Sequence, residues 1–433
     1  MITHPLAAKL FEGFSILRWN DRLRPMEFIE TDHHGYKSML TYFLGSLAGG
    51  LDSADWRRIV DGCVFDFLKK ISTSDIHSKV RARIKHEPSF NQFIISDWRN
   101  KRLELSYDFL IDFEEYLKSS PSGILGSILR FSHRYSSLSE LEVISRFCND
   151  ADIEAMISDI KSNLAQNTHD AFSSEANALL ASDNDYWLTK IMSIANRLRY
   201  QMRWGQTPRI PMTSVLGHSM YTAVLTYFTS IKAGLDDARV VNNFYAALFH
   251  DLPEALSRDI ISPIKRMSKE VETLIKGIEE EMFESDILSL IPANLQTNFR
   301  FLTGAIPGVH EFDNRVMIDG AVQVVPWGKD KEDEEFPFFG IMEHLNDYRE
   351  PMKSHLNACG STTLVRGIDG KLIKICDHLS AFMEADMSIL HGIKSPALKT
   401  GRTQIKSTCK KMQTYNLNVE DFFEKVKPYD YFG

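Results

Sequence analysis

The stretch Ala246–Lys265, AALFHDLPEALSRDIISPIK, places a neighbouring histidine and aspartate on an apolar run with helical spacing. His250 and Asp251 are adjacent, and Glu254 follows one helical turn later, on the same face as His250 if the helix continues. His218 opens another apolar helix upstream, and Asp377 lies in the downstream segment KICDHLSAFMEA. Two imidazoles and two carboxylates form a plausible ligand set for a divalent metal ion and leave positions open on an octahedral ion.

Such a site suits the hydrolysis of a phosphate ester. A metal ion lowers the pKa of its water and neutralises the charge that builds on the phosphate. Glu254 is placed to hold or deprotonate the attacking water as a general base or acid. Each residue taken singly has a simpler explanation, because a His–Asp pair on a helix is usually structural and an isolated aspartate can cap a helix or pair with a lysine. Two observations favour the metal site: these residues occur as an ordered set, and part of the set is lost in a degenerate copy near the N-terminus, described below.

Composition limits the classes of protein that the chain can belong to. Its 433 residues allow two domains or one large one, and 43% are hydrophobic and 25% charged, as in ordinary globular proteins. The net charge of −8 argues against a large basic face for duplex nucleic acid. The five cysteines show no CxxC spacing, the N-terminus is too polar for a secretory signal, and no apolar run of about 18 residues exists. We therefore expect a cytoplasmic protein without a membrane span.

Hydrophobic spacing predicts an all-α fold. Helical periodicity recurs from the N-terminal part of the chain to Leu372–Met383, and the modest strand candidates are Val322–Val325 and Thr363–Val365.

The chain also contains an internal repeat. Shifting its first part by 185 residues superimposes twelve identical residues without a gap. They are Arg18, Trp19, His33, Tyr36, Leu40, Thr41, Tyr42, Phe43, Ala48, Gly49, Asp52 and Asp66, which fall on Arg203, Trp204, His218, Tyr221, Leu225, Thr226, Tyr227, Phe228, Ala233, Gly234, Asp237 and Asp251. Later, RFCNDADIEAM resembles KICDHLSAFMEA, which pairs Asn149 with Asp377.

The first copy lacks the metal-binding residue types. Phe65 stands where the second copy has His250, Lys69 or Lys70 lies near the place of Glu254, and Asn149 replaces Asp377. A phenyl ring and a neutral amide cannot replace an imidazole and an anionic ligand. We therefore expect a degenerate repeat over residues 1–165 that keeps the fold without the metal, followed by a metal-binding domain over residues 185–433.

The second copy carries an insertion at about residues 298–369. It includes an acidic run from Asp330 to Glu335, which is either a solvated surface loop or, less simply, a lid near the active site.

The second copy resembles the HD-domain metal-dependent phosphohydrolases, and within them the bacterial 5'-deoxynucleotidase branch. The resemblance covers about residues 185–290 and 370–390. The matching segments are RW at Arg203-Trp204, GHS around His218, HDLPEALSRDIISPIK from His250 to Lys265, and KICDHLSAF around Asp377.

This resemblance implies an all-helical HD fold and a role for each matching residue. His218, His250, Asp251 and Asp377 would bind one divalent ion, such as cobalt, manganese, magnesium or another first-row ion. Glu254 would handle the nucleophilic water, Arg203 would contact the phosphate, Trp204 would pack against the sugar, and Asp259 would hydrogen-bond the sugar hydroxyl. An arginine suits phosphate independently, because its guanidinium binds bidentately.

The chain departs from that branch in two ways. The connection before Asp377 is long and ends in STTLVRGIDGKLIKICD, where the branch has a short connection with a glutamate-rich helix. Family members are also about half this length and commonly pair as homodimers. We therefore expect the first copy to fill the partner's place in an intramolecular pseudo-dimer.

The function expected from these features is the removal of phosphate from (deoxy)nucleoside 5'-monophosphates by a metal-activated water. The substrate would be a small nucleotide, with no duplex nucleic acid and no membrane as partner. Two alternatives remain: an HD hydrolase of nucleoside triphosphates or cyclic nucleotides, and a non-catalytic nucleotide-binding or regulatory protein.

Overall fold

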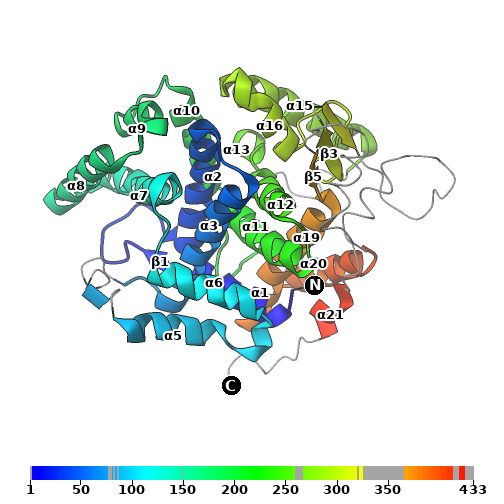
Figure 1. The fold of residues 1–433 in the computed structure, drawn as a ribbon. Coiled ribbons are helices and arrows are strands. Elements are labelled where there is room, and N and C mark those ends of the chain that lie inside the picture. Colours follow the sequence, from blue (N-terminus) through cyan, green and yellow to red (C-terminus); the bar gives the residue numbers. More distant parts are fainter. Residues whose placement is uncertain are drawn as a thin grey trace, which may run out of the picture.

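The structure is a computed structural model that describes residues 2–76, 80, 83–84, 87–148, 150–258, 267–318, 321–324, 365–412 and 419–424. It is mainly helical, which confirms the all-α prediction (Figure 1). Before residue 181 the helices are α1 (His4–Phe11), α2 (Glu30–Ala48), α3 (Ser53–Thr73), α5 (Pro88–Trp98), α6 (Tyr107–Lys118), α7 (Gly123–Ser145), α8 (Ala151–Asn167) and α9 (Ser173–Leu180). After it they are α10 (Trp187–Tyr200), α11 (Val215–Lys232), α12 (Asp237–Phe249), α13 (Glu254–Ser257), α15 (Lys269–Asp286), α16 (Ala293–Thr303), α19 (Gly370–Leu390), α20 (Pro396–Lys410) and α21 (Val419–Glu424).

The described strands are short. β1 (Leu17–Arg18) pairs antiparallel with β2 (Phe28–Ile29). β3 (Arg315–Ile318) lies between β4 (Ala321–Val324) and β5 (Val365–Ile368), and both of its pairings are antiparallel. Of the two predicted strands, Val322–Val324 lies on β4 and Val365 begins β5, whereas Val325, Thr363 and Leu364 lie outside the described residues. The acidic run Asp330–Glu335, and with it the choice between loop and lid, lies outside the described residues.

Four helices form the centre of the molecule. α2 packs against α11 and α3 packs against α12, and Figure 1 shows these four together at the middle of the ribbon. α11 has no exposed face over most of its length: its residues are buried without interruption from Val215 to Ser230, as expected for a helix surrounded by others. α7 covers α2 on one side, and α19 covers α11 on the other. This arrangement fixes α11, α12 and α19 against one another, and these helices carry the candidate ligands.

Among the described helices, none combines the length and the apolar character needed to cross a membrane.

Candidate metal centre

The four predicted ligands come together from three helices that are distant in sequence. His218 lies in the first turn of α11, where the Ser214 side chain caps the helix by accepting from the Gly217 amide. His250 and Asp251 follow the last residue of α12, and Asp377 lies in α19. His218, His250 and Asp251 each offer a ligand atom within 4.8 Å of the others.

Asp377 completes the group. Its Oδ1 atom lies 2.9 Å from Nε2 of His218 and 3.8 Å from Nε2 of His250. Nε2 of His250 also lies 3.2 Å from Oδ1 of Asp251. Since Nδ1 of His250 faces the carbonyl of Ala247 at 2.7 Å, a proton on Nδ1 leaves the Nε2 lone pair for the shared centre.

The turn after α12 differs from the predicted continuous helix. α12 ends at Phe249, and the Leu252 amide bonds back to Phe249 in a tighter turn. Pro253 explains the break, because it has no N–H and disfavours helical geometry at the preceding residue. Glu254 therefore starts the separate helix α13 and does not lie one turn along the helix of His250. It still lines the same cavity as His250 and Asp251.

The electrostatics of the group favour an added positive charge. Burial opposes protonation of His250, but the charges of Asp251 and Asp377 outweigh it and raise its pKa to about 10. For His218, burial and Arg203 act against protonation, yet hydrogen bonds to Asp377 and Glu384 raise its pKa overall. Burial works against ionised Asp377 as well, but hydrogen bonds with His218, His250 and His378 hold its pKa well below the usual range.

These residues fit a divalent metal ion. Oδ2 of Asp251 is buried and has no hydrogen-bond partner among the described residues, which is costly for a carboxylate unless a cation satisfies it. Imidazole nitrogens with carboxylate oxygens suit several first-row ions. The donor set is therefore compatible with a metal but does not select one.

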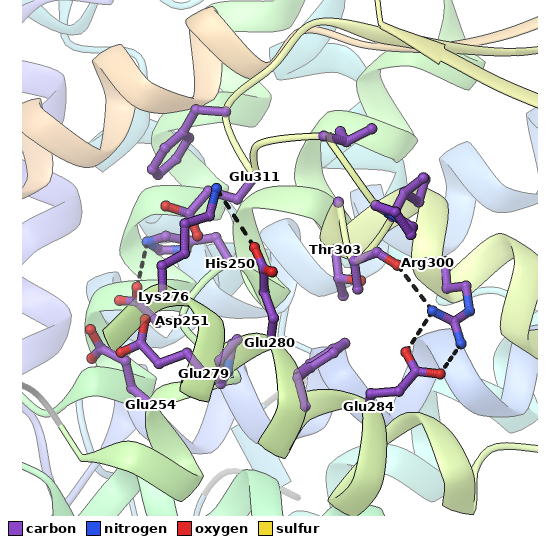
Figure 2. A pocket seen from close by; sticks show the side chains of 18 of the residues that line it. His250, Asp251, Glu254, Lys276, Glu279, Glu280, Glu284, Arg300, Thr303 and Glu311 are labelled. Atoms are coloured by element: carbon purple, nitrogen blue, oxygen red, sulfur yellow. Dashed lines mark hydrogen bonds and ion pairs between the residues drawn. The ribbon is translucent and has the colours of Figure 1, made fainter. Parts of the chain in front are cut away.

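The cavity beside the centre has a volume of about 480 Å³, which suits a small-molecule ligand. Figure 2 shows His250, Asp251 and Glu254 at one end and the Arg300–Glu284 ion pair at the other. The polar residues that line it are Arg203, His250, Asp251, Glu254, Lys276, Glu279, Glu280, Glu284, Arg300, Thr303, Glu311 and Asp377.

Helix α15 supplies a wall of this cavity that the sequence analysis missed. Its segment KEVETLIKGIEEEMFESD is glutamate-rich and amphipathic, and Glu279, Glu280 and Glu284 face the cavity. The resemblance to the 5'-deoxynucleotidase branch placed such a helix in the connection directly before Asp377. The glutamate-rich segment can be read from the sequence, but it lies before the insertion and not after it.

The three predicted substrate-binding residues have different outcomes. Arg203 lines the cavity, and its Nη1 lies 3.6 Å from Oδ2 of Asp251. Trp204 is absent from the cavity lining; its indole donates to Glu384, and its ring lies where a side chain on Gly401 would collide with it. Asp259 lies outside the described residues.

The N-terminal part places a different set of side chains around His33. Nε2 of His33 faces Nδ1 of His133 at 3.2 Å, in the place that Asp377 takes beside His218. The pairing of Asn149 with Asp377 is therefore wrong. α7, which carries His133, packs on α2 as α19 packs on α11, whereas Asn149 follows the end of α7 and is outside the described residues.

A lysine accompanies Asp66 in this N-terminal cluster. Lys37 donates to Asp66 at 2.5 Å, and its side chain is fully buried. Burial and the neighbouring Arg18 charge lower the pKa of His33 to about 3, opposite to the shift at His218. The surroundings of His33 thus disfavour an added cation, whereas those of His218 favour one.

Comparisons with known proteins place the part of the chain that carries the candidate metal centre near the HD-domain proteins. The HD domain family model matches residues 195–406. A 5'-deoxynucleotidase of Shewanella oneidensis is 27% identical over 109 residues, covering 24% of this chain and 55% of that protein. A 5'-deoxynucleotidase of Pasteurella multocida is 24% identical over 123 residues, covering 26% of this chain and 58% of that protein. The chain thus spans little more than half the length of either relative. No solved structure matches it significantly.

Proposed function

We propose that this chain, whose residues 195–406 match the HD domain family, is a phosphohydrolase that releases phosphate from deoxynucleoside 5'-monophosphates. The observation that carries the proposal is the convergence of four candidate metal ligands beside a cavity that Arg203 and Glu254 also line. Figure 2 shows His250, Asp251 and Glu254 at one end of this cavity. The printed activity of the two relatives supports the choice of substrate.

The residues divide the chemistry among them. His218, His250, Asp251 and Asp377 would hold one divalent ion, which supplies a water of lowered pKa and neutralises charge on the phosphate. Arg203 presents its guanidinium to the cavity, where it can bind two phosphate oxygens. Glu254 lines the same end and accepts the proton from the attacking water. Its backbone is held by Gln201, whose side chain donates to the Glu254 carbonyl at 2.9 Å.

The charge of the cavity favours a monophosphate over a triphosphate. Away from the metal centre the wall carries Glu279, Glu280, Glu284 and Glu311 against the cations Lys276 and Arg300. Arg300 is bound to Glu284 through both Nη atoms, and Lys276 lies 3.7 Å from Glu280. Two further phosphates would place added negative charge against this acidic wall.

Phosphate release from a panel of nucleotides tests the proposal. Metal-stripped protein is supplied with Mn²⁺, Co²⁺ or Mg²⁺ and given deoxynucleoside and ribonucleoside mono- and triphosphates and cyclic nucleotides. Metal-dependent release from the deoxynucleoside monophosphates is expected. Turnover of only triphosphates or cyclic nucleotides would keep the hydrolase and change its substrate, whereas metal binding with no turnover would indicate a nucleotide-binding or regulatory protein.

We also propose that residues 1–165 form a degenerate HD-like unit that takes the place of a dimer partner. Tyr42 and Tyr227, at matching positions of the repeat, each contact the other part of the chain. Tyr42 packs on Tyr245 of α12 with ring centroids 5.2 Å apart, and Tyr227 donates to Asp61 of α3. Such reciprocal contacts are expected of a pseudo-symmetric interface.

Metal titration should therefore reveal one site per chain. Removing the ion with a chelator is expected to abolish phosphate release and to lower the melting temperature, because an ion at 100 times its Kd stabilises the fold by about 2.7 kcal/mol. Isothermal titration of stripped protein and thermal unfolding with and without Mn²⁺ measure both effects. A stoichiometry of two ions per chain would contradict the proposal that the N-terminal unit has lost its site.

A further inference from the structure

We propose that Glu384 is the positioning residue that aligns the metal ligand His218 and the phosphate-binding Arg203 at the same time. The inference rests on the proposed function of the site, and it assigns a role to a residue that does not itself reach the cavity. Glu384 lies in α19, two helical turns after Asp377 and on the same side of that helix.

Three donors converge on its buried carboxylate. Oε2 accepts from Trp204 Nε1 at 2.7 Å and from Arg203 Nε at 3.3 Å. Oε1 lies 3.1 Å from Nδ1 of His218. The carboxylate is fully buried, and Arg203 Nε lies 3.2 Å from its Oε1 as an ion pair. An ionised Glu384, which only accepts, matches the three N–H groups that face it.

The contact with His218 determines which nitrogen can bind a metal. An anion beside Nδ1 keeps a proton on that nitrogen, so Nε2, which faces Asp377 at 2.9 Å, is the nitrogen that can release its proton and bind a metal ion. Ser380 Oγ lies 2.9 Å from the same Nδ1 and helps to fix the ring. Loss of the anion would leave the tautomer and the ring orientation less defined.

The contact with Arg203 holds one edge of the guanidinium and leaves the other for substrate. Nε is bound by Glu384, while Nη1 lies 3.6 Å from Asp251 at the cavity. Arg203 and Trp204 are adjacent, and Trp204 adopts a positive φ of 57° that is unusual for an aromatic residue. A backbone held in this uncommon conformation lets two consecutive side chains reach one carboxylate.

The N-terminal part contains a similar arrangement around Glu140, which also accepts from the buried Arg199 at 2.9 Å. Its Oε2 accepts from Arg18 Nε and Trp19 Nε1, both at 2.8 Å, and its Oε1 lies 3.5 Å from Nδ1 of His33. Trp19 has a φ of 56°, close to that of Trp204. The carboxylate thus accompanies the Arg–Trp–His set in both parts of the chain.

The two sets differ at the outer edge of the arginine. Arg18 donates through Nη1 to Glu30 and through Nη2 to Ser137, so its guanidinium is committed within the protein. Arg203 instead faces the cavity. Glu140→Gln is therefore a matched control for Glu384→Gln: the same isosteric change, in the same kind of buried contact, away from the metal centre.

The experiment measures metal affinity and kinetics of both variants in the full chain. Glu384→Gln is expected to weaken Mn²⁺ binding by 10- to 100-fold, as is typical for loss of an outer-shell partner, and to raise KM because Arg203 is no longer held. Glu140→Gln should lower the melting temperature while Mn²⁺ affinity and KM stay at the wild-type values. Wild-type Mn²⁺ affinity and KM in Glu384→Gln would overturn the inference, as would equal losses in both variants.

A second variant covers the case in which Glu384→Gln does not fold. Glu384→Asp keeps the charge that neutralises Arg203 but withdraws the carboxylate from His218, so the same loss of Mn²⁺ affinity is expected. Wild-type affinity in Glu384→Asp would overturn the role at His218. Calorimetric metal titration needs no substrate, so an error in the proposed nucleotide would leave this result unchanged, and a failure of the inference would leave wild-type phosphate release intact.

Discussion

Asp377→Asn is expected to abolish both metal binding and phosphate release. Asp377 supplies an anionic oxygen that lies close to both histidines, at 2.9 Å from His218 and 3.8 Å from His250. Asparagine has nearly the same shape but no charge, so the cluster loses its attraction for a cation. Loss of an outer-shell partner already costs 10- to 100-fold in affinity or activity, and loss of a ligand should reduce kcat/KM by more than about 100-fold. Calorimetric titration with Mn²⁺ and phosphate release measure the two effects.

The matched control is His133→Asn. His133 stands beside His33 as Asp377 stands beside His218, but its surroundings include the Lys37–Asp66 ion pair. The change should alter the melting temperature and leave Mn²⁺ affinity and the rate of phosphate release unchanged. Retention of metal-dependent activity in Asp377→Asn would remove Asp377 from the ligand set, and loss of Mn²⁺ binding in His133→Asn would show that the N-terminal cluster contributes to it.

The sequence was sufficient to select the four candidate ligands, because their identities and order carry the chemistry. His218, the adjacent pair His250 and Asp251, and Asp377 come from three distant parts of the chain, and the structure brings them together. Apolar helical periodicity likewise predicted the helices that hold them. Such features depend on local pattern and residue type, both of which can be read from a single sequence.

The pairing of Asn149 with Asp377 failed because it rested on similar residue types in two segments that do not occupy equivalent helices. RFCNDADIEAM resembles KICDHLSAFMEA, but its Arg146 already lies beyond the end of α7. The better signal was the spacing of the buried contacts: His133, Ser136 and Glu140 recur as Asp377, Ser380 and Glu384. In each helix these three residues lie on one face. The serine and the glutamate are the same in both helices, whereas His133 stands in the place of the candidate ligand Asp377.

Three-dimensional features account for the other differences. The spacing of Glu254 from His250 suggested one continuous helix, and the structure breaks it before Pro253. The resemblance to the 5'-deoxynucleotidases implied that Trp204 packs against the sugar, whereas its indole nitrogen donates to Glu384 and the residue does not line the cavity. Residue spacing does not encode tertiary packing. That packing determines how the chain turns before Pro253 and which way the Trp204 ring points.

Glu254→Gln should separate catalysis from metal binding. Glu254 begins α13 at the metal end of the cavity, and Gln201 holds its backbone in place (Figure 2). A glutamine keeps the shape of the side chain but cannot accept the proton of the attacking water, so kcat should fall by about 10²- to 10⁴-fold. Mn²⁺ affinity should remain that of the wild type, because the four proposed ligands are untouched.

The control for this variant is Glu281→Gln, an exposed carboxylate of α15 that does not line the cavity. It removes one negative charge near the site without touching the chemistry, so kcat and KM should stay unchanged. A fall in Mn²⁺ affinity in Glu254→Gln would make Glu254 a ligand, and a wild-type kcat would assign the proton transfer to another group. A lower kcat with intact metal binding would identify Glu254 as the base and would also show that bound metal alone is not sufficient for hydrolysis.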